Sequence, residues 1–113
     1  MTIEEYYALG FNEAAKRDKF FKNVNEHINH AREKHPFFCE LGKYDAEKFA
    51  AFAKAFKEVI PAEPTLANVL LSEVYECLEA FAKGDKAQAF EEACDVVAVL
   101  YRAYAGDIKE GVK

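Results

Sequence analysis

Residues 65–106, TLANVLLSEVYECLEAFAKGDKAQAFEEACDVVAVLYRAYAG, decide the fold of this chain because they contain two helix signatures in direct succession. Thr65 begins the first helix, which ends near Gly84. Asp85 caps the second helix, which ends at Gly106. Since only a residue or two lies in the turn between them, the two helices should pack antiparallel as a hairpin.

The rest of the chain is also helical in pattern, with abundant Ala and Glu, sparse Val and Thr, and no alternating strand pattern. Thr2 forms a capping box with Glu5 and opens a helix that Gly10 can interrupt. A further helix is expected over residues 18–34. Asp45 begins another, with an apolar side made of Phe49, Phe52, Ala53, Phe56 and Ile60. The sequence predicts an all-α bundle of four to five helices.

Composition places this bundle in one domain, residues 1–113, with 51% hydrophobic and 31% charged residues. No apolar run approaches the roughly 20 residues of a membrane span, and the acidic start MTIEEYY lacks the bases of a signal peptide. We therefore expect a cytoplasmic protein with no membrane partner. The net charge of −5 argues against a nucleic-acid polymer as partner. The three cysteines are predicted to be small core residues in a reducing compartment: Cys39, Cys77 and Cys94.

Four acids take matched positions on the two helices of the hairpin. On a wheel of roughly 100° per residue, Glu73 lies within the apolar face of its helix, and Glu92 lies in the equivalent place on the next. Glu76 and Asp95 lie about 60° away, at the edge of the same faces. Other acids of these helices, Glu79 and Glu91, fall on the surface.

This arrangement is suited to a hard metal ion. Residues at i and i+3 share a helix face, and two such carboxylate pairs can surround one Mg²⁺, with Mn²⁺ as a possible substitute. Any one of these acids taken alone could instead be solvated, and Glu73 could pair with a Lys or Arg. Four acids in matched positions favour the metal site.

The pattern Ser72-Glu73-x-x-Glu76 followed by Glu92-x-x-Asp95 resembles the signature of the MazG-like all-α nucleoside triphosphate pyrophosphohydrolases, E-E-x-x-E and then E-x-x-D. That superfamily also includes dimeric dUTPases, dCTP pyrophosphatases and phosphoribosyl-ATP pyrophosphatases. The resemblance covers residues 70–105. Ser72 stands where many members have the first Glu. The wheel places it on the polar side, so this difference need not remove a ligand.

The resemblance implies a MazG-like domain in which four acids are the Mg²⁺ ligands and catalytic residues: Glu73, Glu76, Glu92 and Asp95. It implies hydrolysis of a (d)NTP between the α- and β-phosphates, giving (d)NMP and pyrophosphate, in a housecleaning role. It also implies a homodimer or homotetramer with the substrate pocket near a subunit interface. The exposed apolar surface expected on Phe49, Phe52 and Phe56 favours such an oligomer as well.

Several further side chains are weaker candidates for substrate binding. Cations at the ends or edge of the acidic helices could contact the phosphate tail: Lys83, Lys86 and Arg102. A polar face on the second predicted helix could line the base or sugar pocket: His27, His30 and Lys34. Ordinary surface positions are the alternative for both groups. Three aromatic residues could stack on a base, although core packing is favoured for them: Phe37, Phe38 and Tyr44.

Two functions of other classes compete with the enzyme. One is a noncatalytic helical interaction module, phage accessory or antitoxin-like, which would use the same bundle without turnover. The other is a di-iron carboxylate bundle, which is disfavoured because neither acidic pair contains the histidine of a Glu-x-x-His motif. Magnesium-dependent nucleotide hydrolysis is therefore the predicted function.

Overall fold

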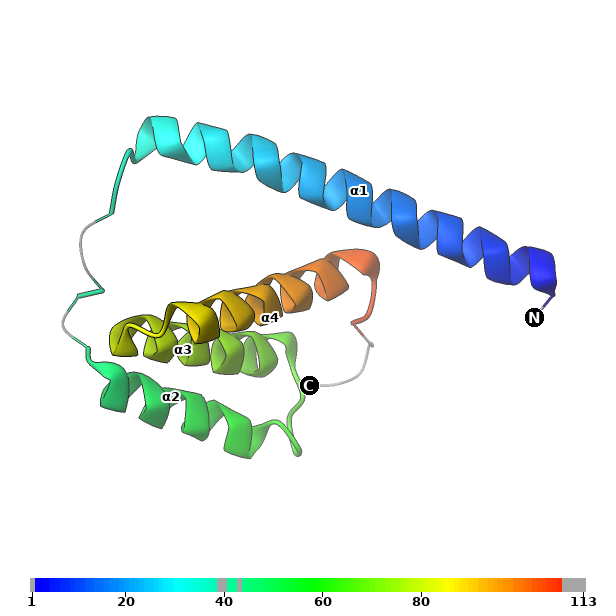
Figure 1. Cartoon of the computed structure of the whole chain (residues 1–113). Helices are drawn as coiled ribbons and strands as arrows, with labels where there is room; N and C mark the ends of the chain where they lie inside the picture. The colour runs from blue at the N-terminus through cyan, green and yellow to red at the C-terminus, as the bar shows by residue number, and fades with distance from the viewer. Residues whose placement is uncertain (1, 39–40, 43, 109–113) are drawn as a thin grey trace. The chain divides into compact units, whose positions relative to one another are not determined.

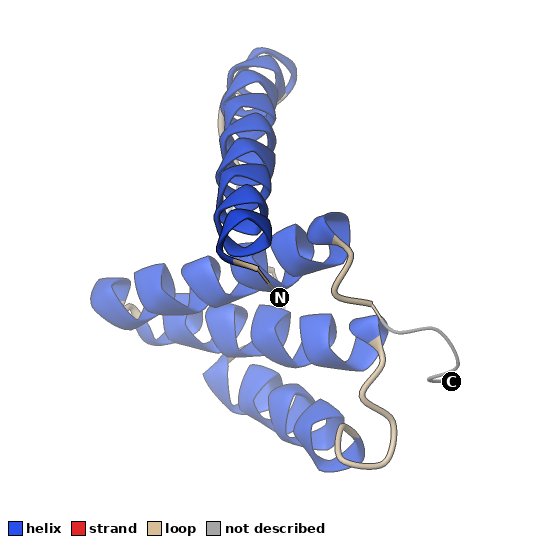
Figure 2. Cartoon of the chain, turned by 90° about the vertical axis from the view of Figure 1, so that its right-hand side faces the viewer, coloured by secondary structure: helices blue, strands red, loops and turns tan. Residues whose placement is uncertain are grey.

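The described part of the chain consists of α-helices and the loops that join them. The structure, a computed structural model, describes residues 2–38, 41–42 and 44–108. Its helices are α1 (Ile3–Lys34), α2 (Ala46–Val59), α3 (Leu66–Lys83) and α4 (Lys86–Ala105), labelled in Figure 1. These residues contain no strand, as Figure 2 also shows, so the all-α prediction is confirmed for them. None of the described helices combines the length and the apolar character that crossing a membrane requires.

The chain divides into two compact units, Met1–Cys39 and Glu40–Lys113. The first unit contains α1, and the second contains α2, α3 and α4. All four predicted metal ligands belong to the second unit. The prediction of one domain over residues 1–113 stays a prediction.

Helix α1 is a single helix rather than the two that the sequence suggested. The Thr2 hydroxyl accepts a hydrogen bond from the Glu5 backbone N–H at 3.1 Å, which confirms the predicted cap. The helix then continues through Gly10, so the expected interruption there is wrong. One glycine inside a helix costs only about 1 kcal/mol relative to alanine, which the capped start at Thr2 and the long helical segment after Gly10 outweigh. The helix ends at His35, whose N–H donates to the Ala31 carbonyl at 2.7 Å.

The helix boundaries of the second unit follow from local capping. Asp45, Thr65 and Asp85 each accept a hydrogen bond from the backbone N–H three residues later, at 3.0–3.2 Å. The connection between α3 and α4 is short because Gly84 adopts a left-handed conformation, with φ of 72°, that side chains disfavour. These caps lie where the sequence predicted them, and they establish the α3–α4 hairpin.

Helix α3 lies between the other two helices of its unit, because it packs against α2 on one side and α4 on the other. No contact between α2 and α4 is found within the described residues. The α2–α3 side is aromatic: the Tyr75 ring lies 6.5, 5.1 and 5.7 Å from the rings of Phe49, Phe52 and Phe56. Phe49 is only 4% exposed. Phe49 is thus covered within the chain and the other rings are partly covered, which weakens this argument for the predicted homo-oligomer; the oligomer stays a prediction.

Ser72 corrects the helical wheel. The wheel places this residue on a polar side, but in the structure it is 1% exposed and its hydroxyl donates to the Val69 carbonyl at 2.7 Å. A wheel assumes one buried face, whereas α3 has a neighbouring helix on each of two sides. The position at which many MazG-like proteins carry a glutamate is therefore buried in this chain.

The cysteines differ from one another in burial. Cys77 is half-buried, and its Sγ lies 3.9 Å from the Ala89 carbonyl oxygen, so it packs between α3 and α4 as predicted. Cys94 is exposed, and its prediction as a core residue is wrong. Both are free thiols, and Cys39 lies outside the described residues.

Candidate metal centre

Three acids from the two helices of the hairpin converge on one point. Glu73 on α3 and Glu92 and Asp95 on α4 each offer a carboxylate oxygen, and these three oxygens lie within 4.8 Å of one another. We call these three residues the acidic triad. The antiparallel hairpin places them together, because the short turn at Gly84 folds α4 back along α3. Three of the four predicted ligands are therefore adjacent in the structure.

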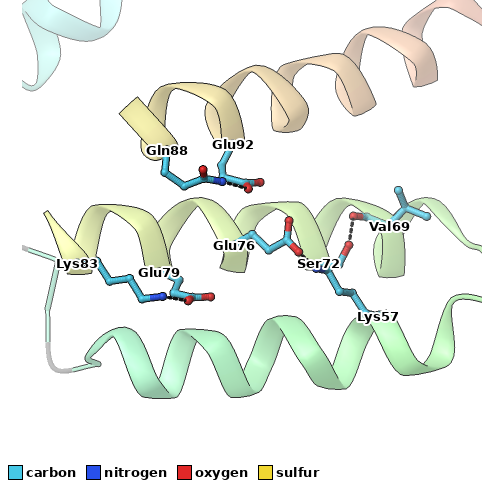
Figure 3. Close-up of polar contacts among 8 residues, drawn as sticks. All are labelled: Lys57, Val69, Ser72, Glu76, Glu79, Lys83, Gln88 and Glu92. Carbon is cyan, nitrogen blue, oxygen red and sulfur yellow. Dashed lines mark hydrogen bonds and ion pairs between the residues drawn. The ribbon is translucent and has the colours of Figure 1, made fainter. Parts of the chain in front are cut away.

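Two oxygens of the triad are buried without a hydrogen-bond donor. Glu73 Oε2 and Glu92 Oε2 both have this property within the described part of the chain. The second oxygen of Glu92 accepts a hydrogen bond from the Gln88 side-chain amide at 2.6 Å, drawn in Figure 3. Leaving a buried carboxylate oxygen unsatisfied is unfavourable, and the penalty is larger for charged groups than for neutral ones. A cation bound between these oxygens would remove that penalty.

The electrostatics of Glu73 also favour a cation. Burial raises the pKa of the Glu73 carboxyl above its ordinary value, and the negative charges of Asp95 and Glu92 raise it further. Lys57, which acts in the opposite direction, does not cancel these effects. The triad thus concentrates negative charge in a partly dry place, where a divalent ion gains strong attraction. Three converging carboxylates, two of them with an unsatisfied buried oxygen and the third exposed, are a donor set that fits Mg²⁺ or Mn²⁺.

The fourth predicted ligand, Glu76, lies outside the triad. Its carboxylate forms an ion pair with the Lys57 ammonium group of α2, shown in Figure 3. The Glu76 side chain is 17% exposed and that of Lys57 is 56% exposed. The sequence analysis did not identify Lys57. The sequence indicated only that an acid on an apolar helix face needs a cationic partner. It did not indicate which lysine would form the ion pair with Glu76.

The predicted phosphate-binding cations take separate positions. Lys83 pairs with Glu79 at 2.5 Å near the end of α3, and Lys86 is exposed at the start of α4. Arg102 pairs with Asp107 at 2.9 Å. Lys83 is ten residues from Glu73, which is about 15 Å along a helix, so it lies too far to touch the same ion. None of these three cations reaches the triad directly, and Lys57 is the cation whose charge acts on it.

The remaining candidates are exposed or packed away from the triad. His27, His30 and Lys34 all lie exposed on α1, in the other unit, and their predicted role in substrate binding stays a prediction. Phe37 and Phe38 are 81% and 88% exposed, so core packing is wrong for both. Tyr44 is 42% exposed, so core packing is wrong for it as well, although its ring lies 6.1 Å from that of Phe49 and 5.6 Å from that of Phe52 on α2.

Comparison of the chain with protein-family models, with curated proteins and with solved structures found no match. The resemblance to the MazG-like superfamily therefore rests on the spacing of the acids in the sequence. What the structure adds independently is the acidic triad, with two unsatisfied buried oxygens, on an antiparallel helical hairpin.

Proposed function

We propose that this chain is a magnesium-dependent nucleoside triphosphate pyrophosphohydrolase. It would cleave the bond between the α- and β-phosphates of a (d)NTP, releasing a monophosphate and pyrophosphate, and so remove damaged or surplus nucleotides. The observation that supports this proposal is the acidic triad with its two unsatisfied buried oxygens. Single surface acids need no cation, but a cation would stabilise three converging carboxylates of which two have a buried oxygen without a donor.

Bound Mg²⁺, or Mn²⁺ in its place, would supply the charge that neutralises phosphate oxygens and the acidity that activates water. Glu73, Glu92 and Asp95 would hold the ion. Gln88 fixes the rotamer of Glu92 by donating to its other oxygen, as outer hydrogen bonds commonly orient metal ligands. Glu73 and Glu92 are half-buried, which would strengthen their attraction to the ion, whereas Asp95 is exposed and leaves that side open to substrate.

Glu76 contributes in a different way from the triad. It lies one turn from Glu73 on the same helix and is held by Lys57. The positive charge of Lys57 also acts on the triad, because it opposes the rise in the pKa of Glu73. Glu76 would thus hold this lysine near the site through their ion pair rather than bind the ion itself.

A turnover assay tests the proposal. The purified chain is incubated with Mg²⁺ and a panel of canonical and modified dNTPs and NTPs, and the release of pyrophosphate and monophosphate is measured. We expect turnover that EDTA abolishes. The conservative variants Glu73→Gln and Glu92→Gln should lower kcat/KM by about 100-fold or more, because each removes a charged ligand.

Glu91→Gln is the matched control, since Glu91 is the exposed neighbour of Glu92 outside the triad. It should retain full activity. Equal losses in Glu91→Gln and Glu92→Gln would contradict the assignment of the triad. If no nucleotide in the panel is hydrolysed, the noncatalytic interaction module becomes the better explanation of the fold.

A further inference from the structure

A pocket of about 320 Å³ lies at the end of the hairpin where α3 begins and α4 ends. Ligand sites typically measure about 300–1,000 Å³, so this one has room for a small rigid group. Its walls are largely apolar and come from both helices and the segments next to them: Pro64, Leu66, Val69, Val99, Ala103 and Ile108. An apolar wall of this kind accepts the face of a planar ring and disfavours a phosphate.

The pocket lies one helical turn beyond the triad on the same two helices. Val69 precedes Glu73 by four residues, and Val99 follows Asp95 by four, so each pocket residue lies on the same helix face about 6 Å from its acid. Arg102 lies seven residues beyond Asp95, about 10 Å along α4. One molecule could therefore place charged groups at the triad and an apolar group in the pocket.

A polar pair lines the same pocket. Arg102 donates to Asp107 at 2.9 Å, and their side chains are 66% and 50% exposed. A pair this exposed contributes little to stability, so its donor and acceptor groups can be exchanged with a ligand at small cost. The carboxylate of Asp107 already balances the Arg102 charge. The pair is therefore better suited to an uncharged ring whose edge carries hydrogen-bond donors and acceptors than to a phosphate.

We propose that this pocket receives the base and sugar of the nucleotide whose phosphates lie at the triad. The inference rests on the function proposed above and adds the orientation in which the nucleotide would bind along the hairpin. The phosphates would point toward the Gly84 turn, and the nucleoside would lie between the start of α3 and the end of α4. Base preference would then depend on the apolar lining and on the Arg102–Asp107 pair.

Two variants that each add an aromatic ring test whether filling the pocket weakens substrate binding. Val99→Phe adds an aromatic ring inside the pocket, whereas Ala98→Phe adds the same ring at an exposed neighbouring position outside it. We expect Val99→Phe to raise KM for the nucleoside triphosphate by about tenfold or more with little change in kcat, and Ala98→Phe to leave both unchanged. A circular-dichroism melt confirms that each variant folds.

A binding measurement keeps the test independent of turnover. The chain has no tryptophan, so Leu66→Trp introduces a single fluorescent reporter in the pocket wall, and Phe90→Trp introduces one at the opposite end of the hairpin. Nucleosides and nucleoside monophosphates are titrated without metal. A saturable change in Leu66→Trp and none in Phe90→Trp supports the proposal.

The outcomes separate the two proposals. If the unsubstituted chain hydrolyses nucleotides while Val99→Phe keeps its KM and Leu66→Trp does not respond, the pocket assignment is overturned and the function stands. If no nucleotide is hydrolysed, the proposed function fails. In that case a saturable response of Leu66→Trp still supports a nucleoside site, and a missing response overturns it.

Discussion

Lys57 on α2 and Glu76 on α3 form an ion pair that divides the four matched acids into a group of three and a group of one. The lysine comes from the helix on the opposite side of α3 from α4. The Lys57 charge partly opposes the rise in the Glu73 pKa that burial and the other two acids cause, and so acts on the triad as well. In the absence of a metal ion, this lysine is the cation that partly balances the site.

Replacement of Lys57 should therefore change metal binding. In Lys57→Met we expect the metal-free protein to lose about 1 kcal/mol of stability, because the mostly buried Glu76 loses its partner. Mg²⁺ should bind more tightly, since a competing positive charge is gone. Urea unfolding and calorimetric titration measure the two effects. Lys54→Met, an exposed lysine one turn earlier, is the control. Unchanged Mg²⁺ affinity in Lys57→Met would show that the Lys57 charge does not influence the metal site.

Addition of Mg²⁺ should stabilise the folded chain. At a concentration 100 times the dissociation constant, a ligand that binds only the folded state contributes about 2.7 kcal/mol. We expect a corresponding rise in Tm for the unsubstituted chain and for Glu91→Gln, and a much smaller rise for Glu73→Gln and Glu92→Gln. Differential scanning calorimetry with Mg²⁺, with Mn²⁺ and with EDTA provides the comparison. The same rise in all variants would mean that the ion binds elsewhere.

The stability of the metal-free protein should depend on pH through Glu73. The pKa of this carboxyl is raised above 4.5 in the folded state, so the folded state binds its proton more tightly than the unfolded state does. The resulting contribution to stability is present below pH 4.5 and is lost as the pH rises through the folded pKa.

Glu73→Gln removes this dependence. The variant should be more stable than the unsubstituted metal-free chain at pH 7 and similar to it near pH 4, since a neutral amide avoids the repulsion from Asp95 and Glu92. Urea midpoints measured across this range without metal test the sign. If Glu73→Gln stabilised the protein more near pH 4 than at pH 7, the pKa of Glu73 would not be raised by burial and by its acidic neighbours.

The hydrogen bond from Gln88 to Glu92 should matter for metal affinity. Loss of an outer hydrogen bond commonly weakens a metal site by 10–100-fold. Because Gln88 is exposed, we expect Gln88→Leu to weaken Mg²⁺ binding by about tenfold, at the lower end of that range. Ala87→Leu places the same side chain at the exposed adjacent position and should bind Mg²⁺ normally. Titration calorimetry compares the two variants. Equal Mg²⁺ affinities would show that Gln88 does not contribute to the site.

Ser72 provides a prediction about the departure from the MazG-like pattern. Ser72→Glu would introduce the glutamate that many MazG-like proteins carry at the matching place in their motif, but at a position that is 1% exposed. We expect it to destabilise the fold by about 3 kcal/mol or more, whereas Ser72→Ala should cost about 1 kcal/mol through the lost hydrogen bond to Val69. Chemical denaturation distinguishes them. A stable Ser72→Glu protein would show that α3 can rotate to expose this position.

The hairpin could be predicted from sequence because its determinants are local. The caps at Thr65 and Asp85 and the left-handed Gly84 each depend on a few neighbouring residues. The same information brings Glu73, Glu92 and Asp95 together, since two consecutive antiparallel helices with matched periodicity turn equivalent faces toward each other, but the prediction wrongly grouped Glu76 with them. The pairing of Glu76 with Lys57 could not be predicted, because it depends on how α2 is rotated against α3, and aromatic packing around Tyr75 sets that rotation.

The closeness of the triad in sequence has a consequence for how the protein folds. Glu73 and Asp95 are 22 residues apart, and one short turn brings them together. Contacts of such low sequence separation form early, because little chain entropy is lost in closing the loop. The three carboxylates would then meet when the hairpin closes. Divalent ions present at that stage would relieve the repulsion and act on the rate of folding as well as on the final stability.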